Sequence, residues 1–183
     1  MTGPEVRRLF LALWPEAAVR AALLEVQRGL PADIGRAVKA DNLHITLAFL
    51  GSTPAQRQSC IEAALDDVVA QCFSLQLDRL GFWRKPQVLW VGSERSPPPL
   101  QTLVDGVGRA VAQCGCRLDS RPFQIHLTLF RKVRKPPREL PVVAPIQWPV
   151  ESFALVESVT AASGVCYKVL KTWALGTAVA GRA

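Results

Sequence analysis

The first third of the chain alternates short apolar runs with a segment of helical periodicity. Residues 9–13 form a continuous apolar run, which predicts a buried strand, and residues 43–50 form a second strand-like segment that stops at Gly51. Between them, from Pro15 to Gly29, apolar residues recur at helical spacing, at Val19, Ala22, Leu23 and Val26. This part of the chain therefore predicts strand, helix and strand.

The middle of the chain predicts a second helix and a hairpin. Thr53-Pro54-Ala55-Gln56 would supply an N-cap, a proline at the first helical position and a glutamine for a capping box. The apolar stripe of that helix follows, at Ile61, Ala64, Leu65 and Val68. Residues 73–77 alternate as a half-buried strand does, and 88–91 resemble a partner strand, with the basic and aromatic loop 82–86 as the hairpin tip.

The last part of the chain is rich in predicted strands. A third helical stripe follows prolines 97–99, at Leu100, Leu103, Val104, Val107 and Val111. The next expected segments are a strand at 125–130, a proline-rich connector at 136–149, strands near 152–157 and 166–175, and a frayed tail at 177–183. Strands and helices do not alternate regularly, so we expect an α+β fold with antiparallel pairing.

Composition narrows the class of protein. The 183 residues, 49% of them hydrophobic, suffice for one domain or two small packed lobes, and no run of about 20 apolar residues is present to span a bilayer. The five cysteines are scattered without a C-x-x-C pair, so we expect reduced thiols in a cytoplasmic protein.

Charge points to a polyanionic partner without identifying it. The formal net charge is +7, and five of the eight residues in the segment 131–138 are basic. Two interpretations of this segment stay open: a solvated loop, and a patch that steers phosphate groups.

The chemistry is concentrated in a repeated motif. The chain has two histidines, and both lie in His-x-Thr-Leu, as His44-Ile45-Thr46-Leu47 and His126-Leu127-Thr128-Leu129. Because alternate residues of a strand share a face, each strand presents an imidazole beside a hydroxyl and turns its apolar residues into a core. Arg131 would reach the same face only if the strand bends or ends near Phe130.

Two imidazoles suit a reaction in which one proton is removed and another is delivered near neutral pH. In-line attack of water on a cyclic phosphodiester is such a reaction, and Thr46 and Thr128 can donate hydrogen bonds to the phosphoryl oxygens. A single histidine on a half-buried strand is more often structural, but two matched copies 82 residues apart favour a shared site. Two histidines without a Cys, Asp or Glu cluster offer too few zinc ligands, so we expect no metal and no cofactor.

At these motifs the chain resembles the two-histidine phosphoesterases, and among them the RNA 2′,3′-cyclic phosphodiesterases formerly called 2′-5′ RNA ligases. The similarity extends over nearly the whole length, including residues 8–13, 42–51, 88–92, 121–123, 167–170, Trp173 and Leu175. Ile125 and Phe130 depart from it, since many relatives have a proline and a small residue there.

The resemblance implies a fold and a set of roles. It implies one domain over residues 1–183 with two pseudo-symmetric lobes, each an antiparallel sheet backed by helices, around a central cleft. It implies that His44 donates a proton to the leaving 3′ oxygen, that His126 accepts one from water, and that the product is a 2′-phosphomonoester. Thr46, Thr128 and Arg131 match the positions that hold the phosphate.

Substrate contacts and rival activities follow from the same residues. Phe82, Trp83 and Tyr167 are candidates for stacking on a terminal base, and Arg84 for contact with the backbone, with structural aromatics as the alternative. The expected partners are RNA with 2′,3′-cyclic phosphate ends or small cyclic nucleotides, bound by a monomer that does not associate with membranes. The rivals are 2′-5′ ligation of tRNA halves, hydrolysis of a small cyclic nucleotide, and non-catalytic binding of RNA ends.

Overall fold

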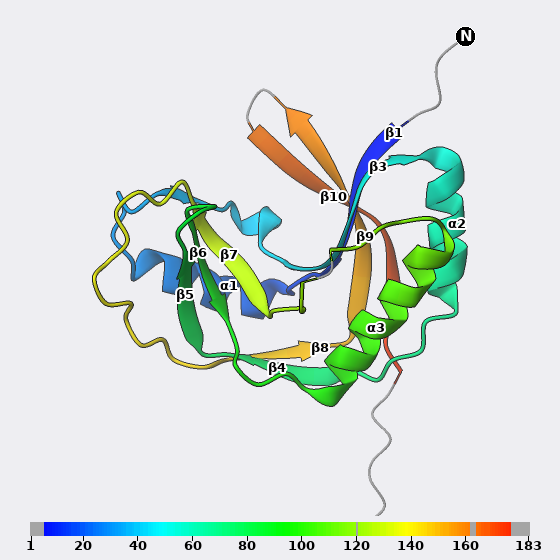
Figure 1. Ribbon diagram of the computed structural model, residues 1–183. Helices are drawn as coiled ribbons and strands as arrows, with labels where there is room; N and C mark the ends of the chain where they lie inside the picture. Colours follow the sequence, from blue (N-terminus) through cyan, green and yellow to red (C-terminus); the bar gives the residue numbers. More distant parts are fainter. Residues whose placement is uncertain (1–5, 120, 162–163, 177–183) are drawn as a thin grey trace, which may run out of the picture.

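The computed structural model describes residues 6–119, 121–161 and 164–176, and these form an α+β arrangement (Figure 1). The strands in this part of the chain are β1 Val6–Leu13, β2 Arg36–Ala37, β3 Ile45–Pro54, β4 Phe73–Leu77, β5 Arg79–Trp83, β6 Val88–Gly92, β7 His126–Arg131, β8 Ile146–Val150, β9 Ser152–Ala161 and β10 Gly164–Ala174. The helices are α1 Ala17–Arg28, α2 Ala55–Asp66, α3 Pro98–Gln113 and a 3-10 turn, Ala40–Asn42. The tail expected at 177–183 lies outside the described residues.

One antiparallel sheet runs through the middle of the molecule. Its strand order is β10-β9-β1-β3-β7-β6-β5, with β2 beside β7, while β4 and β8 form a separate two-stranded sheet. The resemblance implies a separate sheet in each lobe; the strands instead form two halves of one sheet. These halves join where β3 meets β7, at the Cα pair Ile45 and Leu127.

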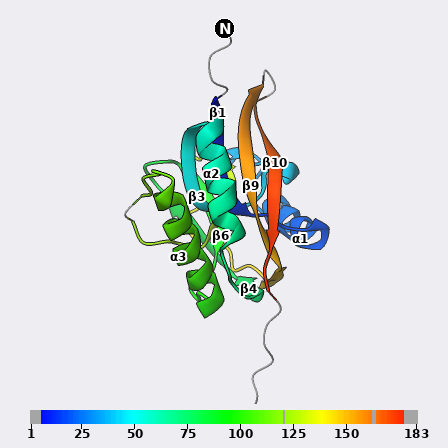
Figure 2. The same ribbon diagram turned by 90° about the vertical axis from the view of Figure 1, so that its right-hand side faces the viewer.

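The two faces of this sheet differ. Leu9, Leu11 and Leu13 of β1 turn toward the three helices, into a large core that also takes Leu23, Ile61 and Leu103 from them. Figure 2 shows α2 and α3 lying together over this side of β3. The intervening Phe10 and Ala12 turn to the opposite face and form a small cluster with Ala154 and Val156 of β9. That second face carries both histidines.

The predicted hairpin of residues 73–77 and 88–91 is wrong. β4 pairs with β8, and β6 pairs with β5, a strand that the sequence pattern does not reveal because Gly81 interrupts it. All of β8 except its last residue, Val150, lies inside the predicted connector, where Pro149 argues against a strand. Proline is tolerated there because each strand of a two-stranded sheet has a free edge, and Pro149 pairs with Ser74.

The start of α2 also differs from the prediction. Pro54 occupies the N-cap position, and no side chain caps the helix. The Thr53 hydroxyl donates instead to the carbonyl of Gly51, 3.1 Å away, and Thr53 itself is fully buried as part of β3. The capping box is therefore absent because the strand runs directly into the helix.

The expectation of reduced thiols fails for one pair of cysteines. Cys60 of α2 and Cys114, at the end of α3, form a disulfide between positions 54 residues apart. Helical packing brings together two residues whose spacing carries no signal in the sequence. Cys72, Cys116 and Cys166 are free thiols.

Candidate active site

The strand pair β3–β7 places the two motifs in equivalent positions. An antiparallel pair has a local twofold axis, and here the paired residues, Ile45 and Leu127, stand at the same place in each motif. Continuing this register by one residue sets His44 opposite Thr128 and Thr46 opposite His126. Cross-strand partners share a face, and diagonal neighbours lie about 7–8 Å apart. The two histidines are such diagonal neighbours on one face of the sheet.

His44 is held at both ring nitrogens. Its Nδ1 lies 2.7 Å from the carbonyl oxygen of Asn42, and its Nε2 lies 3.1 Å from Oγ1 of Thr46. Because a carbonyl can only accept, Nδ1 carries the proton in the neutral ring, and Nε2 is the acceptor. The Asn42 side chain in turn donates to the carbonyl of Val165 on β10, so this outer strand braces the motif.

The Nδ1 atom of His126 is held in the same way as that of His44. The His126 Nδ1 lies 2.9 Å from the carbonyl oxygen of Gln124, again two residues before the histidine. The repeated contact fixes the same tautomer in both rings and leaves each Nε2 to exchange protons. Because the two imidazoles have matching Nδ1 contacts on equivalent strands, their Nε2 atoms can act from opposite sides of one reacting centre.

The surroundings of the two rings lower their affinity for protons. Burial is the main cause that lowers the pKa of His44 to about 4, and the charges of Arg131 and His126 act in the same direction against the Asn42 hydrogen bond. Burial also lowers the pKa of His126, with a contribution from Arg131. Both imidazoles are therefore neutral near pH 7 in the free protein, and an anion between them would favour protonation.

A β-bulge brings Arg131 to the site. Trp90 pairs with Thr128 and Leu89 pairs with Phe130, so Leu129 is an extra residue on β7. A bulge of this kind shifts the alternation of side chains by one position. Phe130 consequently lies in the core, and the shifted alternation turns Arg131 toward the face of His126, where its charge acts on the pKa of both histidines.

A buried glutamine satisfies the backbone at the bulge. Nε2 of Gln27, on α1, donates to the carbonyl oxygens of Leu129 at 2.8 Å and of Val38 at 3.1 Å. The Val38 amide also donates to the Leu129 carbonyl, at 2.8 Å. The extra residue on β7 is thereby fixed from the helix side of the sheet.

Aromatic rings surround both histidines. The Trp14 ring stacks on His44 with the centroids 5.5 Å apart, and Tyr167 meets the same imidazole edge-on at 5.0 Å. Trp83 contacts His126 at 4.6 Å between centroids. Two of the three aromatic residues named as candidates for base stacking, Trp83 and Tyr167, therefore lie beside the histidines. Arg84 is exposed in the turn that follows β5.

Phe82 is the predicted contact that the structure does not bring to the site. It pairs with Leu89 and packs against the main core, on the opposite side of β5 from Trp83. Strand alternation sends neighbouring residues to opposite faces, so Phe82 and Trp83 cannot both face the histidines. Phe82 therefore packs on the core side of the sheet and does not face the histidines.

Other residues at the site are not indicated by the sequence pattern. Phe10 lies 4.9 Å from His44 between ring centroids, and Trp90 supports Trp83 at 5.4 Å. A Cβ on Gly81 would stand 2.1 Å from the Trp90 ring, so glycine is what lets this indole lie over β5.

Phe49 is a further residue that the motif itself could have revealed. It follows His44 by five residues, as Arg131 follows His126, and a second bulge at Leu47 brings it to the same face. Its side chain is 69% exposed and lies 6.4 Å from Phe10 between ring centroids. One motif therefore places a cation, and the other an aromatic ring, at equivalent positions.

A large cavity lies away from the histidines. It has a volume of about 690 Å³ and is lined by residues of α1 and of the segment 141–149, and neither histidine contributes to it.

The described residues offer neither the ligand cluster of a metal site nor a helix of the kind that spans a membrane. Among them, no group of three or more His, Cys, Asp or Glu side chains is placed to hold a metal ion. No helix in the same residues has the length and apolar character that crossing a membrane requires.

Comparison with known proteins assigns the chain to a family. A family model described as the 2′-5′ RNA ligase superfamily matches residues 14–161, and the chain belongs to this superfamily. The RNA 2′,3′-cyclic phosphodiesterase of Escherichia coli (strain K12) is 33% identical over 172 residues, which are 93% of this chain and 98% of that protein. The protein of the same name from Archaeoglobus fulgidus is 30% identical over 176 residues, 91% of this chain and 99% of its own length. The resemblance seen in the sequence is confirmed.

Solved structures agree with this assignment. The crystal structure of E. coli LigT in apo form has a TM-score of 0.88 at 32% identity, covering 94% of this chain and 99% of that one. E. coli LigT complexed with 3′-AMP has a TM-score of 0.87 at 33% identity, covering 93% and 99%. The fold described above is thus a LigT-like fold.

Proposed function

We propose that this chain is an RNA 2′,3′-cyclic phosphodiesterase, a hydrolase that opens a 2′,3′-cyclic phosphate at an RNA end to a 2′-phosphomonoester. The observation that carries the proposal is the placement of two imidazoles on one sheet face, in equivalent positions, each with Nδ1 bound to a carbonyl. Near relatives over almost the whole chain bear the name of this activity.

The reaction needs two proton transfers, and each histidine performs one. His126, neutral, takes a proton from water through Nε2 as the water oxygen bonds to phosphorus. The bond from phosphorus to the 3′ oxygen breaks on the opposite side, and protonated His44 gives its Nε2 proton to that oxygen. The phosphate stays on the 2′ oxygen, and the two histidines have exchanged protonation states.

The phosphoryl oxygens are bound by neighbouring donors. Thr46 and Thr128 stand beside the two imidazoles, and Arg131 supplies a positive charge at the end of β7. Donors fixed in this way stabilise the charge that develops in the transition state. The proposed reaction uses no metal, because these side chains provide the acid, the base and the oxyanion contacts.

Binding of the substrate favours protonation of His44, which is the proposed general acid. The lowered pKa of His44 means that the free protein holds little imidazolium near neutral pH. A bound phosphodiester brings a negative charge next to the ring, which raises the pKa of His44 and opposes the effect of Arg131. His44 therefore gains its proton together with the substrate.

The wider organisation is part of the same proposal. The local twofold between the motifs extends to two pseudo-symmetric lobes of one domain over residues 1–183, which acts as a monomer on RNA in the cytoplasm. The continuous sheet supports this, because its halves meet at the axis between the motifs. Ligation to a 2′-5′ bond is the same ring opening with a 5′-hydroxyl in place of water as the nucleophile, and the family description keeps it as the second candidate.

The test is hydrolysis of a short RNA with a 2′,3′-cyclic phosphate end by the parent protein and by His44→Ala and His126→Ala. We expect each variant to lose at least about a thousandfold in kcat, which is within the range for acid–base catalysis, while it retains binding of a 2′-phosphate-ended product. The parent should give the 2′-phosphate and be unaffected by EDTA. Cyclic mononucleotides and tRNA halves, assayed in parallel, rank the rival substrates by rate.

Several results would count against the proposal. Undiminished turnover in either variant would remove that histidine from the mechanism. A 3′-phosphate product would reverse the assignment of the leaving oxygen, and loss of activity with EDTA would show that a metal takes part. Faster joining of tRNA halves than hydrolysis would favour the ligase.

A further inference from the structure

Six exposed cations lie on two neighbouring segments on the side of the molecule that carries His126. We call it the basic band; its members are Arg84, Lys85, Arg131, Lys132, Arg134 and Lys135. Ion pairs in the described parts of the chain involve other cations, namely Arg7, Arg20, Arg28, Arg79, Arg121 and Lys171. The band is therefore a concentration of positive charge without a carboxylate partner in those parts.

Two segments distant in the sequence are fastened together to make the band. The amide of Val133 donates to the carbonyl of Gln87 at 3.0 Å, which joins the loop after β7 to the turn between β5 and β6. Val133 is buried, and a Cβ on Gly35 would stand 2.8 Å from the Arg131 carbonyl oxygen, so the 34–38 segment packs closely on this loop. The backbone that carries these cations is therefore fixed in place by packing and hydrogen bonding.

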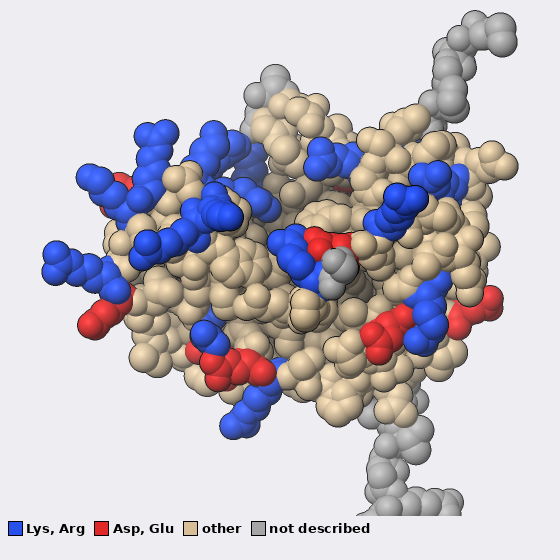
Figure 3. Space-filling view, viewed as in Figure 1, with Lys and Arg blue, Asp and Glu red and all other residues tan. Residues whose placement is uncertain are grey.

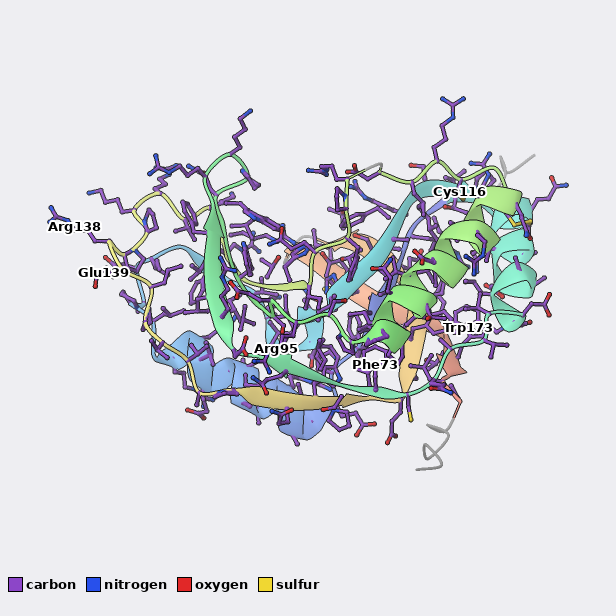
Figure 4. All side chains as sticks on the ribbon, turned by 60° about the horizontal axis from the view of Figure 1, so that its bottom comes forward. Phe73, Arg95, Cys116, Arg138, Glu139 and Trp173 are labelled. Atoms are coloured by element: carbon purple, nitrogen blue, oxygen red, sulfur yellow. A yellow bond between two sulfur atoms is a disulfide. The ribbon has the colours of Figure 1, made fainter. Side chains whose placement is uncertain are left out.

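The band begins at the site. Its first member, Arg131, acts on the pKa of both histidines, and Arg84 directly follows Trp83, the ring in contact with His126. Figure 3 shows Lys and Arg gathered at the upper left of this view, where Figure 1 places the tip of β5–β6 and the loop after β7. Figure 4 shows the outer end of that loop, where Arg138 is followed by the acidic Glu139.

We infer that the basic band binds the sugar-phosphate backbone of the RNA strand that ends in the cyclic phosphate. Like charges held side by side repel one another, and a chain of phosphates running over them would relieve that repulsion. A mononucleotide reaches only the histidines and Arg131, whereas an oligonucleotide also reaches the rest of the band. This inference rests on the proposed function and makes the protein selective for oligonucleotides.

The experiment compares two substrates in two variants that each lose three positive charges. The first variant is Lys85→Ala/Arg134→Ala/Lys135→Ala, which leaves Arg131 and the histidines intact. The matched control is Arg57→Ala/Arg109→Ala/Arg117→Ala, with exposed cations of α2, of α3 and of the segment after it. The substrates are a cyclic-ended RNA of about ten nucleotides, within the usual range of single-strand sites, and a 2′,3′-cyclic mononucleotide.

The band variant should raise KM for the oligonucleotide about tenfold at low salt and leave KM for the mononucleotide within about twofold. The dependence of log KM on log salt should flatten by roughly 2, since each lost phosphate contact removes about 0.7 from the slope for a single strand. The control should match the parent for both substrates.

Equal effects on both substrates, no effect on either, or the same effect from the control would each overturn the inference. Fluorescence anisotropy with a 2′-phosphate-ended oligonucleotide measures the band directly, whatever the catalytic result. If the parent hydrolyses neither substrate, the proposed function fails, and unchanged anisotropy in the band variant would overturn the band separately.

Discussion

At the scale of single residues, the two histidines share a sequence motif but have different aromatic neighbours. His44 lies under Trp14 and against Phe10 and Tyr167, which exclude water from it, whereas His126 has Trp83 as its neighbour. The pKa of His44 falls to about 4, and the pKa of His126 is also lowered. For the proposed acid, His44, this lowered pKa opposes protonation, and the proposed mechanism has the anionic substrate offset it.

The lowered pKa of His44 predicts how stability depends on pH. An unfolded histidine takes up a proton near pH 6.5, whereas folded His44 does so only near pH 4. The stabilisation is therefore complete above pH 6.5 and is lost as pH falls through that window, by up to about 1.4 kcal/mol per pH unit. Urea unfolding between pH 7.5 and 4.5 measures it.

The His44→Gln variant should show a shallower loss of unfolding free energy over the same pH range, because glutamine does not titrate. The His126→Gln variant is the matched control and should keep the part of the pH-dependent loss of unfolding free energy that is due to His44. Parallel curves for the parent and His44→Gln would mean that the His44 imidazole titrates normally in the folded protein.

At the scale of elements, two bulges decide what the motif strands display. The bulge at Leu129 turns Arg131 toward the histidines, and the one at Leu47 turns Phe49 the same way. In each strand the residue after the bulge belongs to the core and the next one to the site. The helix behind the sheet takes part as well, because Gln27 of α1 binds the carbonyl at the first bulge.

Gln27 should therefore act as a positioning residue for Arg131. Replacing it with leucine leaves the carbonyl oxygen of Val38 without this donor and removes one from Leu129, which should cost about 1–3 kcal/mol of unfolding free energy. The loosened bulge should raise KM for a cyclic mononucleotide about threefold or more, because Arg131 is then held less firmly where it binds the phosphate. Steady-state kinetics and urea unfolding test both effects.

Gln58→Leu on α2 is the matched control, because that glutamine bonds only to Glu62 on its own helix. It should leave KM unchanged. A stability loss in Gln27→Leu with KM equal to the parent value would show that Gln27 supports the fold without aiming Arg131.

At the scale of the whole molecule, stability and chemistry are on opposite sides of one sheet. The helices and the large core lie on one face, and the histidines with their aromatic neighbours lie on the other. The disulfide belongs to the helix side, where it ties α2 to the end of α3. Changes there should alter stability while the site keeps its geometry.

Reduction of the Cys60–Cys114 disulfide should lower the free energy of unfolding by about 2–4 kcal/mol, because closing a loop of this size restricts the unfolded chain. The value of kcat should stay the same. Thermal unfolding with and without dithiothreitol measures the effect, and Cys60→Ser/Cys114→Ser should melt like the reduced parent. Cys116→Ser, at a free thiol two residues away, should still respond to the reductant, and identical melting of the oxidised and reduced parent would contradict the prediction.

The sequence by itself determined the motifs, the α+β class, the three helices and most strands, because hydrophobic periodicity and the His-x-Thr-Leu repeat are local patterns. It also named Trp83 and Tyr167 as candidate aromatic contacts for a terminal base, and both rings lie against the histidines. Only the tertiary structure decided that β4 pairs with β8, that Phe82 turns into the core, that Cys60 meets Cys114, and that bulges bring Arg131 and Phe49 to the site. Strand partners, bulges and disulfides depend on contacts between residues far apart in the chain, and a local pattern carries no record of them.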